Sequence, residues 1–342
     1  MRRRDFIISA LFGGLTAPPL LFGDHSVVSQ NPLIAEYNLE SLESIYTPTA
    51  DFYVRCHGSI PAFAGQARLR IEGEVEKSLT LNASDLAHLP RKRLGAVLEC
   101  SGDGVGPYAL AGNAVWEGWA LKDVLEMAHP RSSAGYLHLY GADGFLRSVP
   151  ASRVAHDALL ATSMNRQPLA PEHGGAWRAF FPGWYGMDAV KWLERIVLAG
   201  SPIQPIPDDY QAIVRGKNGT VHREVLPPVQ MKSAFIYPAV GAVLRRGLVS
   251  ARGLVWSDGA PIMTVEVSPD GGKTWKVAKI EPGGKYEWKL WRATIELTQT
   301  GLVQIACKAI GPNGREQPAA PDPSRIDGYA YNVIEKIRVM VI

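Results

Sequence analysis

The pattern of apolar and polar residues divides the chain into two parts of different character. In the first part, alternating or apolar runs predict strands at 67–73, 94–98, 136–140, 145–149 and 190–198. Apolar residues at helical spacing predict a helix at 119–128. Residues 154–164 are expected to form a helix with an adjoining loop. Short strands and helices without a repeating strand–helix rhythm predict an α+β domain rather than a doubly wound sheet.

The second part of the chain has the pattern of strands alone. A proline-rich stretch at 201–209 and the pair Pro227-Pro228 separate it from the first part. Strand-length runs, divided by glycine-rich turn signals, lie at 247–256, 264–268, 275–279, 291–297 and 302–309. Several short strands at such spacing predict an all-β sandwich of immunoglobulin type, although the Cys–Trp–Cys spacing of antibody domains is missing.

The chain is also too long for one ordinary core, which agrees with two domains. Residues 24–50 show no clear period and are expected to form an irregular arm over the body. The predicted segments are a leader with the start of a linker at 1–30, an arm at 31–50, a first domain at 51–205, a linker at 206–230 and the sandwich at 231–342.

The N-terminus begins M-R-R-R-D-F-I and continues with apolar residues to Leu21. Glycine and proline interrupt this stretch, which is too short for a comfortable membrane span. The pattern resembles a twin-arginine signal peptide, whereas the alternative is a basic tail with a loosely apolar helix. We therefore expect export of the folded protein to the periplasm, with cleavage near 23–30 and retention as an anchor both open.

The amino-acid composition and the net charge bear on whether the protein binds nucleic acid. Hydrophobic residues make up 46% of the 342 residues and charged residues 20%, as in an ordinary globular protein. The formal net charge is only +3, and basic residues do not form a stripe interleaved with aromatic ones. We therefore expect no nucleic-acid partner.

The chain has three cysteines, Cys56, Cys100 and Cys307, so at least one stays unpaired or binds something. The sequence contains no C-x-x-C-H, and we therefore expect no covalently attached haem in this chain. Three cysteines are also too few for a cysteine-rich zinc or iron–sulfur site. Cys100 follows an apolar strand, where a thiolate could serve as a soft metal ligand; taken alone, such a cysteine is more often a small buried hydrophobe.

A set of cationic residues adds a candidate anion site. His173, Arg178 and Lys191 lie in one glycine-rich run, and Arg55 and His57 form a second pair. An arginine grips phosphate in a fork, a lysine adds a point charge, and glycines let backbone N–H groups approach closely. Each residue alone could be a surface charge or a hydrogen-bonded core residue. The set, together with the thiol, predicts an anionic cofactor that carries a metal.

Motifs along residues 51–342 resemble the sulfite oxidase family of molybdenum cofactor enzymes. They are F-Y-V-R-C-H, L-E-C-S-G, G-N-A-V-W-E-G-W-A-L-K-D-V-L, M-N-R-Q-P-L-A-P-E-H-G and F-P-G-W-Y-G-M-D-A-V-K-W. Near the C-terminus, V-E-V-S-P-D-G-G-K-T-W and G-Y-A-Y-N-V-I are similar to the family's dimerisation domain. The resemblance implies a molybdopterin-binding catalytic domain, followed by an immunoglobulin-like domain through which the chain forms a homodimer.

The resemblance also implies roles for individual residues. Cys100 would be the protein thiolate on molybdenum, Arg55 would point toward the substrate oxyanion, and Phe145 would occupy a further catalytic position. The molybdopterin cofactor would lie against Tyr53, Val54, Arg55, Cys56, His57, Asp143, His173, Arg178, Ala189, Val190 and Lys191.

Three positions depart from the family pattern. Phe145 stands where the family has an active-site tyrosine in a Tyr-x-x-Ser segment, so we expect a ring that cannot hydrogen-bond an oxyanion there. Asp103 replaces an asparagine, and the arginine that usually follows is missing, so we expect weaker sulfite binding. Cys56 stands where asparagine is common, either as a second thiol in the site or as a swap without function.

The activity implied by the resemblance is oxygen-atom transfer at molybdenum, with sulfite as the default substrate of a sulfite dehydrogenase or oxidase. Since the sequence has no haem or flavin motif, we expect a separate electron carrier such as a periplasmic c-type cytochrome. One alternative is an S- or N-oxide reductase that uses the same metal site. The other is a metal-free binding protein that keeps the fold.

Overall fold

The computed structural model describes residues 25–37, 42, 44–62, 67–104, 109–155, 157–203 and 210–342. Most of the expected leader, at 1–24, and most of the proline-rich stretch, at 204–209, lie outside these residues. Within the described ranges, no helix has the length and apolar character that a membrane crossing requires.

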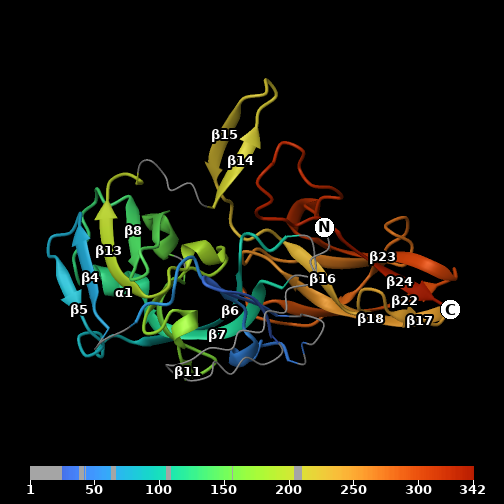
Figure 1. Ribbon diagram of the computed structural model, residues 1–342, viewed down its shortest axis with the longest axis horizontal. Helices are drawn as coiled ribbons and strands as arrows, with labels where there is room; N and C mark the ends of the chain where they lie inside the picture. Colours follow the sequence, from blue (N-terminus) through green and yellow to red (C-terminus); the bar gives the residue numbers. More distant parts are fainter. Residues whose placement is uncertain are drawn as a thin grey trace, which may run out of the picture.

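Strands make up most of the regular structure (Figure 1). The single α-helix of the described residues, α1 (Leu121–Glu126), confirms the helix predicted at 119–128 in a shorter form. The helix predicted at 154–164 is wrong, because the 3-10 turn η3 (Ala151–Ala155) is followed by strand β10 (Leu159–Met164). Pairing of β10 with β7 and β12 on its two sides holds this segment in an extended conformation. The label α+β is therefore loose, and the described residues are mainly β.

Two sheets build the first part of the body. One has the order β5-β4-β13-β8-β9 and consists of β4 (Leu69–Gly73), β5 (Leu79–Leu81), β8 (Tyr136–Gly141), β9 (Leu146–Pro150) and β13 (Leu193–Ala199). The other consists of β6 (Arg91–Glu99), β7 (Ala111–Ala120), β10, β11 (Gln167–Pro168) and β12 (Arg178–Phe180). The apolar layer between them contains Ile71, Leu139 and Ile196 from the first sheet and Trp119 and Leu160 from the second.

Strand β13 begins at Leu193 rather than at the predicted Val190. Trp192 has a positive φ of 49°, which breaks the extended backbone just before the strand. As a result, the residues just before Trp192 leave the sheet. They are free to face the pocket described below.

The N-terminal arm is more regular than its sequence predicts. Strands β1 (His25–Gln30) and β2 (Leu33–Tyr37) form an antiparallel hairpin, and β2 pairs with β3 (Val54–Arg55). The backbone N–H of Cys56 also donates to the carbonyl oxygen of Leu33 over 3.0 Å. The hairpin therefore holds the segment around Arg55 in place.

The C-terminal part stacks two sheets, with the orders β16-β18-β22-β21 and β17-β24-β23-β19-β20. Their strands are β16 (Lys232–Tyr237), β17 (Val243–Leu244), β18 (Gly247–Trp256), β19 (Thr264–Ser268), β20 (Lys276–Val277), β21 (Lys279–Ile280), β22 (Lys289–Leu297), β23 (Gly301–Ile310) and β24 (Glu335–Val341). The predictions at 247–256 and 264–268 are confirmed at both ends. The strand predicted at 275–279 is divided, because β20 joins one sheet and β21 the other.

A buried polar contact joins the two parts of the body. Lys232, the first residue of β16, pairs with Glu99 at the end of β6, and both side chains have no exposed surface. The indole Nε1 of Trp256 donates to the second carboxylate oxygen of Glu99 over 2.8 Å. An apolar cluster that includes Tyr185 and Trp288 surrounds this contact.

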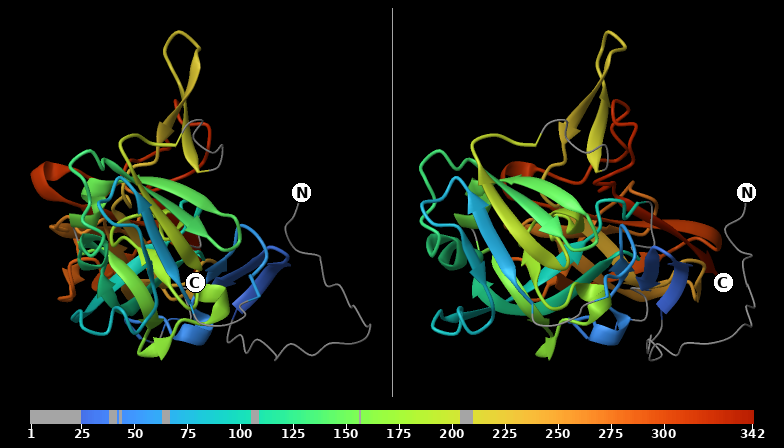
Figure 2. Two further views of the ribbon diagram at one scale, coloured as in Figure 1. Left: turned by 90° about the vertical axis from the view of Figure 1, so that its left-hand side faces the viewer. Right: turned by 60° about the vertical axis from the view of Figure 1, so that its left-hand side comes forward.

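Between the two parts, strands β14 (Gln211–Arg215) and β15 (Val221–Val225) form a second hairpin. Figures 1 and 2 show that this hairpin stands away from the body. The remaining regular elements are the 3-10 turns η2 (Thr49–Asp51), η4 (Pro171–His173), η5 (Gly186–Asp188) and η6 (Pro312–Gly314).

Candidate active site

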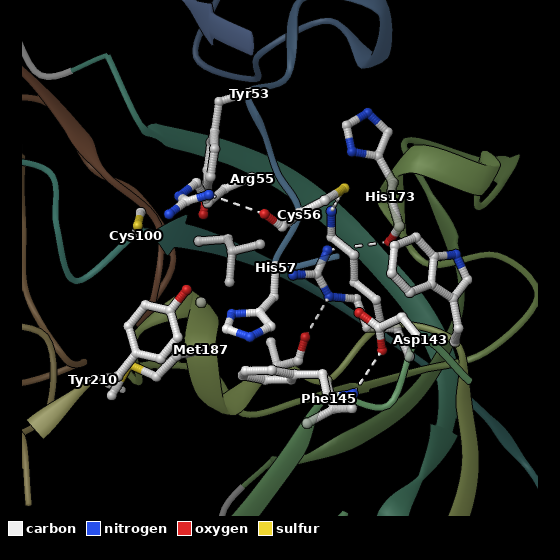
Figure 3. Close-up of a pocket in the computed structure, with 17 residues that line it drawn as sticks. Tyr53, Arg55, Cys56, His57, Cys100, Asp143, Phe145, His173, Met187 and Tyr210 are labelled. Atoms are coloured by element: carbon white, nitrogen blue, oxygen red, sulfur yellow. Dashed lines mark hydrogen bonds between the residues drawn. The ribbon is translucent and has the colours of Figure 1, made fainter. Parts of the chain in front are cut away.

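A pocket lies where the end of β6, the segment after β3, the turn between β8 and β9, and turn η5 come together (Figure 3). The pocket and its open mouth together contain about 620 Å³ of empty space. The lining residues are Tyr53, Arg55, Cys56, His57, Leu98, Cys100, Asp143, Phe145, His173, Arg178, Gly186, Met187, Ala189, Val190, Lys191, Trp192 and Tyr210. Every candidate residue named from the sequence is among them except Val54.

Val54 instead belongs to a small apolar cluster beneath the N-terminal hairpin. It is buried with Leu33, Ala35, Cys56 and Trp192. Its side chain therefore anchors β3 in this apolar cluster, while the adjacent residues Tyr53 and Arg55 line the pocket.

The thiol of Cys100 sits at the end of β6, where the sheet holds it. Its backbone N–H donates to the carbonyl oxygen of Leu110 over 2.9 Å. Burial raises the pKa of the thiol to about 11, and this outweighs the opposite effect of the nearby Arg55 guanidinium. Because a coordinating metal ionises a thiol outright, the chemistry of this position fits a metal ligand.

Two cationic side chains lie beside the pocket, that of Arg178 buried and that of Lys191 partly buried. Arg178 donates to the carbonyl oxygens of Ala189 and His173, and Lys191 donates to that of Glu172 over 2.6 Å. Within the described part of the chain, neither forms an ion pair with a carboxylate. Burial lowers the pKa of Arg178 to about 10 and that of Lys191 to about 8.

A cation that is wholly or partly removed from water is costly without an anionic partner, and an anion bound in the pocket would relieve that cost. The residues present therefore fit a phosphorylated cofactor. Gly186 lets the wall of the pocket come close, because a Cβ there would lie 3.1 Å from the hydroxyl of Tyr53. The residues thus match both parts of the predicted cofactor. The thiol of Cys100 suits the soft metal, and the cationic side chains of Arg178 and Lys191 suit the anionic part.

The turn η5 is held from below by a buried ion cluster. The carboxylate of Asp188 accepts hydrogen bonds from Arg147 at 3.0 Å and from Arg153 at 2.5 Å. The guanidinium of Arg153 also stacks over the ring of Trp184 at 3.4 Å. This cluster fixes the residues on either side of Asp188, Met187 and Ala189, which face the pocket.

Arg55, His57 and Phe145 form the mouth of the pocket. Arg55 donates to the carbonyl oxygen of Cys56 over 2.9 Å, which leaves further guanidinium N–H groups for a ligand. The rings of His57 and Phe145 lie 5.1 Å apart. Asp143 shapes this turn, since its carboxylate accepts the backbone N–H of Phe145 over 3.1 Å.

Tyr210 was missed in the sequence and lines the pocket beside Phe145. Its ring lies 6.1 Å from the ring of Phe145, and its hydroxyl is directed toward the interior of the pocket (Figure 3). A phenol is therefore present at the mouth, although it comes from the linker. No local periodicity marked this residue; a lone tyrosine directly before the short strand β14 was the available signal.

Asp103 does not line the pocket. Its carboxylate accepts the backbone N–H groups of Ala109 and Leu110 over 3.2 and 3.3 Å and so closes the loop after Cys100. Burial raises its pKa to about 7. The carboxyl group is therefore partly protonated at neutral pH, which lowers the negative charge expected beside the metal. Its oxygen binds backbone N–H groups within the loop.

Comparison with known proteins gives first the class of protein. Residues 57–205 match the protein-family model of the oxidoreductase molybdopterin binding domain. Residues 223–341 match the family model of the Mo-co oxidoreductase dimerisation domain. The chain is thus a molybdopterin-dependent oxidoreductase. The molybdopterin cofactor predicted from the sequence is confirmed at this level.

Individual relatives then give the family. The chain is 31% identical to the sulfite oxidase of Gallus gallus, covering 87% of this chain and 73% of the relative, and 29% identical to that of Arabidopsis thaliana, covering 85% and 87%. The crystal structure of the sulfane dehydrogenase SoxCD from Paracoccus pantotrophus matches with a TM-score of 0.81 and 25% identity, over 93% of this chain and 87% of that one. The chain belongs to the sulfite oxidase family. It spans 63% to 65% of the length of the mitochondrial sulfite oxidases of mouse, fly and human.

Proposed function

We propose that this protein oxidises sulfite to sulfate in the periplasm and passes the electrons to a separate carrier. The proposal rests on the pocket, which brings together the buried thiol of Cys100 and the cationic side chains of Arg178 and Lys191; neither cation forms an ion pair with a carboxylate among the described residues. Sulfite oxidases among the relatives, in animals and in a plant, support the choice of substrate. Export rests on the twin-arginine pattern alone.

Cys100 would hold the metal of the cofactor, and Arg178, Lys191 and His173 would hold its anionic part. When bound, the molybdenum cofactor supplies the two-electron oxygen-atom transfer, which the protein itself cannot perform. The positive charge of Arg178 and Lys191 favours an anionic cofactor over a neutral one. Turn η5 supplies a further part of the wall, with Gly186 beside Cys100 and with Met187.

The substrate would enter between Arg55, His57 and Tyr210. A sulfite dianion needs several hydrogen-bond donors, and the guanidinium, the imidazole and the phenol supply them from three separate segments. The ring of Phe145 limits the access of water on the same side. The residues of this chain thus bind and orient the anion for the reaction at the metal.

Tyr210→Phe tests the role of the phenol. We expect kcat/KM for sulfite to fall about 10- to 100-fold, since a hydrogen bond to a charged group contributes about 1.5–3 kcal/mol. Steady-state assays with ferricyanide as acceptor measure this change. Tyr237→Phe, at an exposed tyrosine of the C-terminal sheet, is the matched control and should leave the rate unchanged. Equal rates for the two variants would show that the phenol does not contact the substrate.

Assays in both directions separate sulfite oxidation from the reductase alternative. We expect purified, metal-loaded protein to turn over sulfite with ferricyanide and not to reduce sulfoxides with a strong reductant. Sulfoxide reduction without sulfite turnover at any pH would contradict the proposed direction.

We further propose that the C-terminal sandwich is immunoglobulin-like and carries the dimer contact. Val243, Met340 and Leu302 are cross-strand neighbours on β17, β24 and β23, and all three are exposed. A second copy of the chain would cover this stripe, which agrees with the match to the dimerisation domain. The division into a catalytic domain at 51–205 and a sandwich at 231–342 stays a prediction.

Leu302→Glu combined with Met340→Glu should convert the dimer to a monomer, because each carboxylate would be buried without a partner in the contact. Light scattering after size exclusion measures the mass. Leu248→Glu, at an exposed leucine of the other sheet, is the control and should stay dimeric. A double variant that stays dimeric would move the contact elsewhere.

A further inference from the structure

The hairpin β14–β15 exposes apolar side chains that its own chain does not cover. All five residues of β15 are exposed, among them Val221 at 54% and Val225 at 60%. Figures 1 and 2 show the hairpin projecting from the body between its two parts. A two-stranded hairpin is marginally stable alone in water, and exposed apolar side chains with a polar rim are typical of a contact surface.

One edge of the hairpin is tied to the body, and the other is not. On the β14 side, Ile213 donates its N–H to the carboxylate of Asp327 over 2.8 Å, and Arg215 donates its N–H to the carbonyl oxygen of Ser324 over 2.8 Å. Among the described strands, β15 pairs with β14 alone. The anchored strand holds the outer strand and the hairpin tip in a fixed orientation.

The exposed face combines apolar and positively charged side chains. Cross-strand pairing places Ile213 beside Arg223 and Arg215 beside Val221. Residues 211–225 contain three cations, at positions 215, 217 and 223, and one carboxylate, at position 224, so their net charge is +2 with histidine neutral. Such a face suits a partner that presents a small apolar patch within an acidic rim.

The base of the hairpin is continuous with the pocket. Tyr210, the residue directly before β14, lines the pocket, and its ring lies 5.9 Å from the ring of Tyr329. The ring of Tyr329 in turn lies beside Gly102, and the next residue, Ala330, donates its N–H to Ser101 over 2.8 Å. Aromatic rings therefore connect the loop after the proposed metal ligand to the base of the hairpin.

We propose that the hairpin is the docking surface for the oxidised electron carrier, a one-electron haem protein with an acidic rim around its exposed haem edge. This inference rests on the proposed function. Oxidation of one sulfite with one water gives sulfate, two protons and two electrons, so two carriers dock in turn and each is reduced by one electron. Docking at the hairpin places each carrier next to the rings of Tyr210 and Tyr329, which connect the base of the hairpin to the pocket.

The test compares acceptors that differ in size and charge. The probes are ferricyanide, horse heart cytochrome c, which is basic, and its succinylated form, which is acidic. We expect the wild-type protein to have a lower KM for the acidic form than for the basic form at low ionic strength. In the double variant Arg215→Glu, Lys217→Glu, we expect the KM for the acidic form to rise at least about tenfold, while turnover with ferricyanide stays unchanged.

Two further variants make the result specific. Lys276→Glu with Lys279→Glu makes the same change of charge on the C-terminal sandwich and should leave all three acceptors unaffected. Val221→Ser with Val225→Ser should lower turnover with both cytochromes and keep the preference for the acidic form. The proposal is overturned if the hairpin variants and the sandwich variant change cytochrome reduction equally. Failure of the wild-type protein to oxidise sulfite with ferricyanide would instead contradict the proposed function.

Discussion

Replacement of Cys100 by serine is expected to abolish sulfite oxidation while the fold is kept. A hydroxyl of ordinary pKa stays protonated and is a harder donor than a thiolate, so the metal would lose its protein ligand. Loss of a residue that only supports a ligand already costs 10- to 100-fold, and we therefore expect a loss of more than about 100-fold here. Turnover with ferricyanide and the thiolate-to-metal absorption of the loaded protein measure the effect.

The matched control is Cys307→Ser. This cysteine is buried in the core of the sandwich, far along the chain from the pocket, and its sulfur lies 3.7 Å from a carboxylate oxygen of Glu335. We expect the control to keep full turnover and the same absorption spectrum. Activity in the serine variant at position 100, or an unchanged thiolate absorption, would contradict the assignment of the metal ligand.

Among the variants proposed for stability measurements, Lys232→Met is expected to lower the free energy of unfolding most. Neither the lysine nor Glu99 has any exposed surface, so the substitution leaves a buried carboxylate with the indole of Trp256 as its remaining side-chain donor. Removal of one partner of a buried ion pair costs about 3–5 kcal/mol. The free energy of unfolding in urea, together with the midpoint of thermal unfolding, measures the loss.

Two comparisons identify the cause of that loss. Lys92→Met breaks an ion pair of 2.7 Å with Asp157 in which both side chains are partly exposed to water, at 40% and 37%, and we expect a cost of about 0–1 kcal/mol. Adding Glu99→Gln to Lys232→Met removes the unpaired charge and should recover part of the stability. If the exposed and the buried lysine variants lose the same stability, the contact between β6 and β16 does not stabilise the fold in this way.

Four strands of the sandwich, β18, β19, β22 and β23, could be predicted because their side chains alternate and their ends carry turn signals. Strand β18, for example, has its predicted bounds. Strand β10 could not, since its apolar residues also fit a helix and only pairing with β7 and β12 decides between the two. The hairpin at the N-terminus was missed for a related reason. Strand β2 is stabilised by contact with β3, which lies after a long connection.

The pocket was largely predictable because its residues lie in motifs that resemble one family. Arg55, Cys100 and Lys191 come from three distant segments, yet each stands in a recognisable stretch, and the fold brings all three to one site. Tyr210 stands in no such stretch and reaches the pocket only through the path of the linker. Asp103 shows the opposite case, since its position in the motif suggested a charge at the metal, whereas its hydrogen bonds place it within the loop.

The reaction of the metal-loaded protein with sulfite is the most direct test of the proposed function. The measurement is anaerobic addition of sulfite to protein produced with its cofactor maturation intact, followed by electronic absorption and quantification of sulfate. We predict a sulfite-dependent change in the thiolate-to-metal absorption, sulfate formed in proportion to the bound molybdenum, and reversal of the change by ferricyanide. A folded, molybdenum-loaded protein whose spectrum does not respond to sulfite at any pH would contradict the account.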